Sequence, residues 1–584
     1  MEDQDKWASI VVEEFQNGTT DNQRFIDDYE AYLDLFDAIR SEKDYDWQSD
    51  VFIPELPAHM LTQLGIDVEQ WFKTRDFIET YLQSAVDSAQ RKAMAAELCI
   101  NNTLNSKEVH YFQKFCRMKL ITSLGGHVYA RCWWEKRYGD NDELKCDHFQ
   151  FDILDPRQVR TSSEYTYSIQ DKKWVTLWYD MSLNDLESNK EKMGYFNLDK
   201  LGKPSISELE NGITHKDDPV QEEVFDPNKK FDIYERHGWA WIVKTENGYE
   251  PGIDEHGDKK EGAKWERTIS AVAGQGANKT LIRFQKEPFV REDYNETYYP
   301  LIRGLCYIHP NDDKGVGNGR YSRELQIAIN DAYNLGLDRS RLATIPVLKG
   351  KKYTMEDNSS VFIEPGHVIS LEDPNDLQEL KITDNTNGQL NQISFLAGKM
   401  SQVDSMFPSV QGQMPAASAT ATAIAGTEQR ANTRTNLTSM TFEYTFMAEF
   451  YWMILQMTSQ FAEPETGYAL MGESVYDFDP SPDYWFKPVT QTVETESSKA
   501  AKIAQLNQSM ATISQLGDPR PVNMLLGEIM KLMGKEQENL YGRLFPENQP
   551  LANQGTPGST GGTPSSNQNG IPQSSTEQLA RGAY

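Results

Sequence analysis

The chain has few cysteines, and none of them forms a close pair. The five are Cys99, Cys116, Cys132, Cys146 and Cys306. Because their number is odd and no C-x-x-C spacing occurs, the pattern excludes a disulfide framework and favours reduced thiols in a folded core. No pair of histidines lies near them at ligand spacing, so we expect no zinc site and no other metal site.

Long apolar runs are also missing. The most apolar stretch, Phe450 to Met457, is much shorter than the about 20 residues that a membrane-spanning helix needs. We therefore expect no membrane partner. The first ten residues are acidic, which predicts neither a secretory nor a mitochondrial leader.

Signatures of catalysis are missing as well. The sequence contains no G-x-x-x-x-G-K-[ST], no H-E-x-x-H, no G-x-S-x-G and no set of kinase motifs. The glycines of Gly315-x-Gly-x-Gly come too close together for a dinucleotide fingerprint, so a flexible joint or the start of a helix is the preferred interpretation. Single histidines such as His127 and His309 are expected to be structural. We predict that the chain is not an enzyme and has neither catalytic residues nor a cofactor.

Clustered acidic residues also lack the spacing of a known metal site. Asp312-Asp313 and Glu372-Asp373 do not follow the ligand pattern of an EF-hand, so solvated loops are the preferred interpretation. The 12 Trp and 27 Tyr residues fall mostly at strand or helix positions, which favours core or interface packing over carbohydrate binding.

Basic residues are outnumbered by acidic ones. The chain holds 58 Lys and Arg against 88 Asp and Glu, which gives a formal net charge of −30. Because binding to phosphates rests on Lys and Arg, the general surface should not attract nucleic acid. Two interpretations remain open. The surface is simply well solvated, or it lies near a polyanion without adhering to it.

At 584 residues the chain is too long for one hydrophobic core, so several domains are expected. Apolar residues recur at helical spacing in three N-terminal stretches, 7–42, 68–102 and 109–120. After Gly125 and Gly126 the pattern changes to short runs separated by Gly, Pro, Asn and Asp, which predicts a β-rich or α+β body over 120–315. The expected strands are 128–137, 149–154, 174–179, 231–242 and 280–284.

The most informative pattern is an out-and-back arrangement that follows this body. The run 321–342 predicts a helix with Leu325, Ile329, Ala332 and Leu335 on one face. Short apolar pieces occupy 345–385. A second helical run, 389–407, has Leu390, Ile393, Ala397, Met400 and Val403 or Met406 on a face. At a rise of ~1.5 Å per residue the two helices would be roughly 33 and 28 Å long, so an antiparallel pair is expected.

A loop punctuated by Pro408, Gly412 and Pro415 then leads into a long Ala- and Thr-rich helix that ends near Phe461. Its second half is aromatic and apolar, so we expect it to be buried. The stretch 497–541 predicts amphipathic helices. The last forty residues have too few apolar side chains to form a core, and we predict that they are disordered.

The order and spacing of these pieces resemble the portal proteins of tailed bacteriophages, in particular those of short-tailed phages. Four segments carry the resemblance. They are 147–157 (DHFQFDILDPR), a strand ending in an Asp-Pro turn; 174–186 (WVTLWYDMSLNDL), a strand followed by a helix; 231–239 (FDIYERHGW), a strand; and 315–342, which includes a helix face with Gln326 and Asn330.

The resemblance implies an α+β portal fold with an α/β wing, a helical stem, a small α/β clip and a helical crown. The implied divisions are a wing at 1–318, stem helices at 319–344 and 387–407 around a clip at 345–386, a tunnel loop at 408–416, a long wing helix with a return to the wing at 417–496, a crown at 497–544 and a tail at 545–584.

The resemblance also implies a function. Portal proteins form a homo-oligomeric ring of about twelve subunits, a dodecamer, at one capsid vertex of the virion. Double-stranded DNA passes through the ring without sequence-specific contacts during packaging and ejection. The implied partners are the terminase large subunit, the tail adaptor protein, and the major capsid and scaffolding proteins, with assembly in the host cytoplasm. Two alternatives stay open: another ring or adaptor component of the head-to-tail connector, and a multidomain hydrolase with acidic catalytic residues.

Two groups of residues are candidates for contact with DNA or with a neighbouring subunit. The resemblance places three residues at the tip of the tunnel loop, facing the channel: Gln411, Gln413 and Met414. Basic residues also gather around the helical pair, where they can contact either DNA phosphates or a neighbouring subunit. They are Arg339, Arg341, Lys349, Lys351, Lys352, Arg430 and Arg434.

Overall fold

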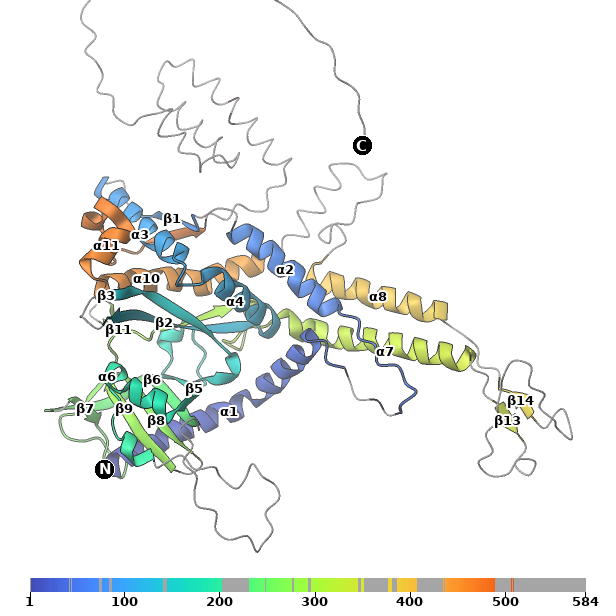
Figure 1. The fold of residues 1–584 in the computed structure, drawn as a ribbon, viewed down its shortest axis with the longest axis horizontal. Coiled ribbons are helices and arrows are strands. Elements are labelled where there is room, and N and C mark those ends of the chain that lie inside the picture. Colours follow the sequence, from blue (N-terminus) through green and yellow to red (C-terminus); the bar gives the residue numbers. More distant parts are fainter. Residues whose placement is uncertain are drawn as a thin grey trace, which may run out of the picture. The chain divides into compact units, whose positions relative to one another are not determined.

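A computed structural model gives the fold of the chain (Figure 1). The residues it describes are 2–40, 43, 45–72, 76–82, 87–139, 144–201, 230–246, 248–275, 278–291, 296–344, 348–350, 377–380, 386–406, 434, 436–488, 506 and 508. The fold mixes helices with antiparallel sheets, which confirms the expected α+β class at this level. Residues 1–492 form one compact unit, and the elements below belong to it.

Helices make up the N-terminal part and the region after the sheets. They are α1 (Glu2–Phe36), α2 (Glu55–Trp71), α3 (Asp87–Asn105), α4 (Tyr111–Gly125), α5 (Leu183–Ser188), α6 (Lys190–Met193), α7 (Asn318–Thr344), α8 (Thr386–Asp404), α10 (Ala448–Phe461) and α11 (Pro464–Met471). A π-helical turn, Glu443–Met447, leads directly into α10. Short 3₁₀ turns lie at Pro156–Gln158, Ile169–Asp171, Leu198–Leu201 and Gly472–Asp477.

Strands fill the region between α4 and α7, and a few lie outside it. They are β1 (Ile78–Tyr81), β2 (His127–Tyr138), β3 (Leu144–Leu154), β4 (Val159–Thr161), β5 (Trp174–Ser182), β6 (Lys230–Thr245), β7 (Gly248–Pro251), β8 (Lys264–Gln275), β9 (Asn278–Lys286), β10 (Val290–Arg291), β11 (Glu296–Thr297), β12 (Leu301–Leu305), β13 (Leu348–Gly350), β14 (Leu377–Glu379) and β15 (Trp485–Pro488).

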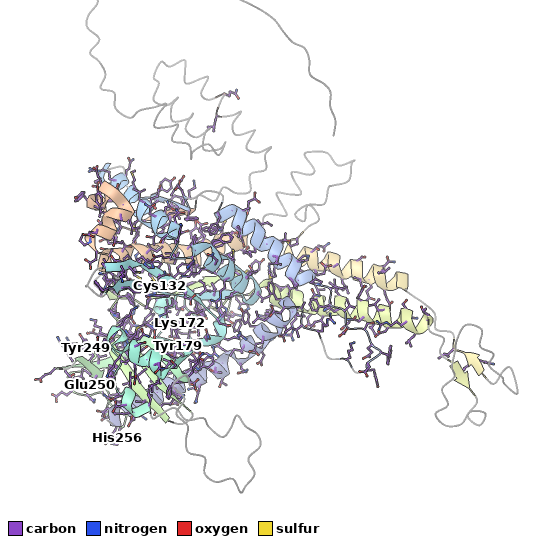
Figure 2. All side chains as sticks on the ribbon, viewed as in Figure 1. Cys132, Lys172, Tyr179, Tyr249, Glu250 and His256 are labelled. Atoms are coloured by element: carbon purple, nitrogen blue, oxygen red, sulfur yellow. The ribbon has the colours of Figure 1, made fainter. Side chains whose placement is uncertain are left out.

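Two antiparallel sheets form the body. The larger has the order β4-β5-β6-β8-β9, with β7 paired to the end of β6, and the smaller has the order β12-β2-β3. α1 covers the larger sheet, where Trp7 and Val11 pack against Ile242 and Val272. Cys132 and Lys172 are buried in the body and Tyr179 is half-buried, whereas Tyr249 and Glu250 lie on β7 (Figure 2).

The principal core lies between the smaller sheet and the helices α3, α4 and α10. Phe450 of α10 lies 4.8 Å from Phe151 of β3, ring centre to ring centre, and it is fully buried together with Phe115 of α4. The prediction that the aromatic and apolar second half of the long Ala- and Thr-rich helix is buried is therefore right for most of its residues but wrong for Tyr444, which is 63% exposed. Among the described residues, no helix has both the length and the apolar character needed to cross a bilayer.

The cysteines also follow the expectation. None is in a disulfide bond, four are buried, and Cys116 is half-buried. The predictions for 411–414, for 417–433 and for the tail lie outside the described residues, as does the crown apart from residues 506 and 508.

One N-terminal prediction was wrong. The stretch 68–102 is not a continuous helix, because β1 interrupts it and pairs with β15 in the register Ile78 to Pro488. The Asn101 side chain accepts hydrogen bonds from the N–H groups of Phe77 and Ile78, at 2.9 and 3.2 Å. A strand partner about 400 residues away therefore outweighs the local helical spacing.

Candidate functional site: the α7–α8 helical pair

The two helices of the out-and-back segment lie side by side (Figure 1). Their facing surfaces meet through Ile329 of α7 and Met400 of α8, both fully buried, with Leu325, Ile393 and Ala397 packed around them. The helical prediction for both runs is confirmed. β13 follows α7, and β14, its antiparallel partner, precedes α8 along the chain.

The expected faces were right except at two leucines. Leu335 is 64% exposed and Leu390 is 50% exposed, so neither lies in the contact between the helices. On α7 the reason is the direction in which successive positions of the helix face. Gly336, four residues after Ala332, takes the inward position, and a Cβ there would lie 3.0 Å from the Gln389 side chain. The glycine thus lets the two helices approach closely.

Close backbone packing fixes the start of α7. A Cβ built on Gly317 would lie 2.4 Å from the carbonyl oxygen of Leu124, and Gly315 has a φ of +72°. Only glycine fits both positions, because one has no room for a side chain and the other has a left-handed backbone. The glycine-rich segment is therefore the start of a helix, and it is held against the end of α4 rather than left as a loose joint.

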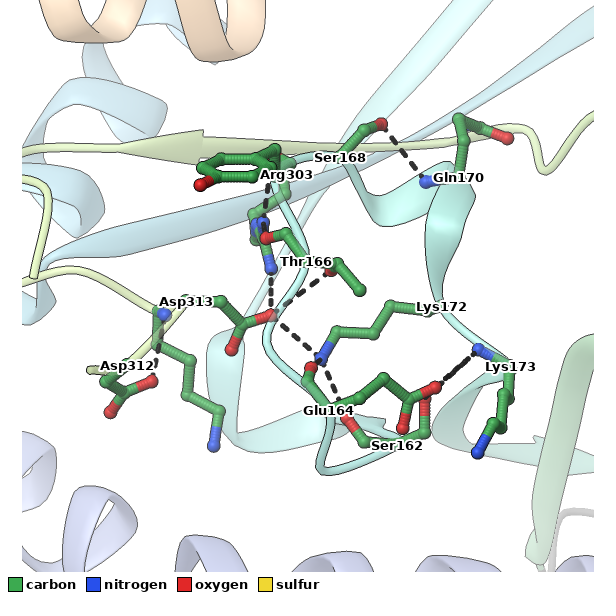
Figure 3. Close-up of polar contacts among 12 residues, drawn as sticks. Ser162, Glu164, Thr166, Ser168, Gln170, Lys172, Lys173, Arg303, Asp312 and Asp313 are labelled. Carbon is green, nitrogen blue, oxygen red and sulfur yellow. Dashed lines mark hydrogen bonds and ion pairs between the residues drawn. The ribbon is translucent and has the colours of Figure 1, made fainter. Parts of the chain in front are cut away.

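A buried ion cluster holds the connection that precedes α7 (Figure 3). One oxygen of Asp313 lies 2.8 Å from Lys172 Nζ and 2.5 Å from Arg303 Nη1. Arg303 also donates to the carbonyl of Thr166, and Lys172 donates to that of Ser162, so the loop before β5 is joined to the same cluster. The solvated loop expected at Asp312-Asp313 is therefore wrong for Asp313.

The charges around Asp313 explain why the pKa of its carboxyl is lowered. Burial alone would raise the pKa of the Asp313 carboxyl, but the hydrogen bond from Lys172 and the charge of Arg303 outweigh it and hold the pKa below its usual value. The aspartate is therefore ionised between two buried cations, and removing it would leave both of them uncompensated.

A second buried cluster holds the end of α8. The carboxylate of Asp404 lies 2.8 Å from Nδ1 of His59 on α2 and also accepts a hydrogen bond from Ser322 of α7. All three side chains are buried. Arg434 donates to the carbonyl of Val403, one residue earlier. The chain thus leaves α8, towards the predicted tunnel loop, from a point that two other helices fix.

Residues 47–56 lie along α7, and we call them the strap; they comprise the end of a turn, an extended stretch at 49–54 and the first two residues of α2. Polar side chains spaced four residues apart on α7 accept hydrogen bonds from the backbone of the strap. Four helical residues advance about 6.0 Å and two extended residues about 6.6 Å, so the two repeats nearly match from Ser49 to Ile53, whereas the fourth donor follows three residues later at the start of α2. The acceptors are Asp338, Asn334, Asn330 and Gln326, and the donors are the N–H groups of Ser49, Val51, Ile53 and Leu56, at 2.7, 2.8, 3.0 and 2.8 Å.

The structure brings some of the predicted basic residues into contacts within the chain. Arg341 donates to the carbonyl of Trp47 in the strap at 3.0 Å. Arg434 is half-buried, and its guanidinium lies 5.1 Å from the ring centre of Tyr307. Arg339 is on the exposed side of α7, and Lys349 is exposed on β13. Contacts of these residues with DNA or with another subunit stay a prediction.

The remaining predicted site residues lie outside the described part of the chain. They are Gln411, Gln413, Met414, Lys351, Lys352 and Arg430.

Sequence reasoning missed the residues that fix the pair. His59 and Asp404 are separated by 345 positions, and no local pattern connects them. The strap had a visible signal, because an amide or carboxylate at every fourth position on one helix face offers a row of acceptors. The predicted helix face includes Gln326 and Asn330 but does not extend to Asn334 and Asp338.

Among the described residues, the arrangement is a pair of packed helices whose base is fixed by buried polar contacts. The buried carboxylates of Asp313 and Asp404 both have polar partners. These contacts fix the start of α7 and the end of α8. A comparison of the sequence with models of known protein families found no match, and neither did a comparison with curated proteins.

Proposed function

We propose that the chain is a portal protein of a tailed bacteriophage. In this proposal, copies of it form a ring of about twelve subunits at one capsid vertex. DNA enters through the ring during packaging and leaves through it during ejection. In this account α7 and α8 form the stem and the segment between them forms the clip, which docks the terminase large subunit and later the tail adaptor. The order of elements along the chain supports this assignment, because a helix leads out, a short β-pair follows and a helix returns.

The observation that carries the proposal is the apolar surface that the described residues leave exposed on the helical pair. Tyr321 is 47% exposed and Leu335 is 64% exposed on α7, and Phe395 is 62% exposed on α8. Tyr321 and Leu335 are fourteen residues apart, which is close to four full helical turns, so they share a face. Large apolar side chains gathered on one element favour burial against a partner.

A second uncovered surface lies on the helix that leads into α10. Leu437, Met440 and Tyr444 are 54%, 53% and 63% exposed, and their spacing of three and four residues places them on one face. Two different apolar surfaces on one chain suit a head-to-tail contact between copies. Such contacts close into a ring when the rotation between copies permits it.

Charge substitutions on the helical pair test the proposal. Leu335→Glu and Phe395→Glu each place a carboxylate in the expected contact, and we expect the assembled fraction to fall at least tenfold in sedimentation velocity. Ser394→Glu, an exposed polar position on α8 next to Phe395, is the matched control and should assemble normally. Unchanged assembly in both apolar variants would rule out this surface as the contact.

An assembly that forms but does not bind the terminase large subunit would favour the alternative, another ring or adaptor component of the head-to-tail connector.

A further inference from the structure

A thiol, an imidazole and a carboxylate lie close together near the end of the β2–β3 pair where β2 ends and β3 begins. Sγ of Cys146 lies 2.9 Å from Nδ1 of His148, and that nitrogen lies 3.1 Å from Oε2 of Glu108. The sulfur and the carboxylate oxygen are 3.9 Å apart. None of these residues takes part in the helical pair.

Two structural elements create the cluster. Cys146 and His148 are two residues apart on β3, so their side chains leave the same face of the strand. Glu108 comes from the connection between α3 and α4, and Nε2 of Gln150 donates to its backbone carbonyl at 2.7 Å. The carboxylate is therefore held opposite the strand by a separate contact.

We propose that Glu108, Cys146 and His148 bind a divalent metal ion of the zinc type. Thiolate, imidazole and carboxylate are the ligands that zinc takes in proteins, and the two anionic ligands would balance its charge. Cys146 and His148 are largely buried, whereas the side chain of Glu108 is 60% exposed. One side of the cluster is thus open to solvent, and water can complete a four-coordinate site.

The distances are close to those that zinc requires. With bonds of about 2.0 Å to oxygen or nitrogen and about 2.3 Å to sulfur, tetrahedral ligand atoms lie about 3.3 to 3.6 Å apart. The three separations here are 2.9, 3.1 and 3.9 Å. The separation of Cys146 Sγ and His148 Nδ1 would have to widen by about 0.6 Å, through rotation of these two side chains, and the exposed Glu108 side chain would have to move by a few tenths of an ångström.

The neighbouring hydrogen bonds show where the protons lie without metal. Lys114 donates to Oε1 of Gln150 at 3.0 Å, which orients the amide so that its Nε2 faces Nε2 of His148 at 2.8 Å. His148 therefore accepts at Nε2 and carries its proton on Nδ1. Metal binding would transfer this proton to Nε2 through solvent and release the thiol proton of Cys146, so one proton leaves and Gln150 must turn its amide.

Gln150 therefore opposes metal binding. A carboxylate at this position would accept from Nε2–H of His148 and would still pair with Lys114, but it would lose the hydrogen bond that Gln150 donates to the carbonyl of Glu108. Carboxylate partners of metal-bound histidines change metal affinity by about 10- to 100-fold. The proposal thus predicts that Gln150→Glu binds zinc about 10- to 100-fold more tightly than the unsubstituted chain.

Zinc titration of the full-length chain by calorimetry, with metal content measured after dialysis, tests the site. We expect one zinc ion per chain, at least 100-fold weaker binding in Cys146→Ser, and weaker binding in Glu108→Gln, whose exposed side chain is not needed for folding. Cys116→Ser removes a half-buried thiol elsewhere and should bind as the unsubstituted chain does.

Spectroscopy identifies the ligands. With Co²⁺ in place of zinc, a sulfur-to-cobalt charge-transfer band should appear in the unsubstituted chain and in Cys116→Ser, and be missing in Cys146→Ser. The proposal is overturned if neither the unsubstituted chain nor Gln150→Glu binds zinc, or if Cys146→Ser binds it as well as the unsubstituted chain. Ring assembly does not enter these measurements, so they stand whether or not the portal function holds.

Discussion

At the scale of single residues, Glu449 on α10 is the clearest source of pH dependence. Burial raises the pKa of its carboxyl to about 7, although a hydrogen bond from Ser168 at 2.5 Å and the charge of Arg303 act in the opposite direction. The folded chain therefore binds a proton here at a pH where the unfolded chain has already lost it. Folding stability should fall as the pH rises from about 4.5 to about 7.

Glu449→Gln should remove the part of this dependence that comes from Glu449, whereas Glu443, whose pKa burial also raises to about 7, keeps its own part. We expect the variant to match the unsubstituted chain near pH 4 and to be more stable at pH 8, by about 3 kcal/mol at most, because each displaced pH unit is worth about 1.4 kcal/mol. Urea unfolding between pH 4 and pH 8 measures the difference. Glu465→Gln on α11, an exposed carboxyl, is the matched control. A stability difference that does not change with pH would contradict the account.

At the scale of elements, the strap joins the acidic N-terminal region to α7. Asn334 makes two hydrogen bonds to Val51, accepting from its N–H at 2.8 Å and donating to its carbonyl at 3.0 Å. Replacing its side chain with a methyl group removes both. We expect Asn334→Ala to lower the free energy of unfolding by about 1 to 2 kcal/mol and to speed amide exchange at residues 49–53 about tenfold.

Hydrogen exchange followed by mass spectrometry measures this effect locally. Asp331→Asn, an exposed position on the same helix, should leave exchange in the strap unchanged. If Asn334→Ala also leaves it unchanged, the side-chain ladder does not hold the strap.

Sequence patterns predicted the helices and strands well where the spacing of apolar residues within one segment is enough to define the element. The helical runs at 321–342 and 389–407 and the strand at 231–242 are all found in the fold. Periodicity shows which face is apolar, so Ile329 and Met400 could be assigned to the contact. It does not show which residues at the edge of that face contact the other helix, so it did not predict that Gly336 takes the inward position and leaves Leu335 exposed.

Contacts between distant segments could not be predicted in this way. β1 becomes a strand because β15 lies beside it. The carboxylate of Asp404 can be buried because the side chains of His59 and Ser322 are its polar partners. The same holds for Glu108, which joins Cys146 and His148 only after α4 and β3 have packed. These pairings depend on the folded backbone, which no single-sequence spacing describes.

At the scale of the whole molecule, we propose that copies of this chain assemble into a closed ring. The claim rests on large apolar side chains left exposed on the α7–α8 pair and on the helix that leads into α10. Within the described residues, burying both surfaces requires further copies or other partners. A net charge of −30 per copy would also make DNA slide past the ring rather than adhere to it, except where basic residues are placed selectively.

The mass of the purified protein tests this claim most directly. Light scattering coupled to size-exclusion chromatography, at micromolar concentration and neutral pH, should give about twelve times the mass of one chain, and averaged electron micrographs of that peak should show rings. A stable monomer under the same conditions would contradict the account.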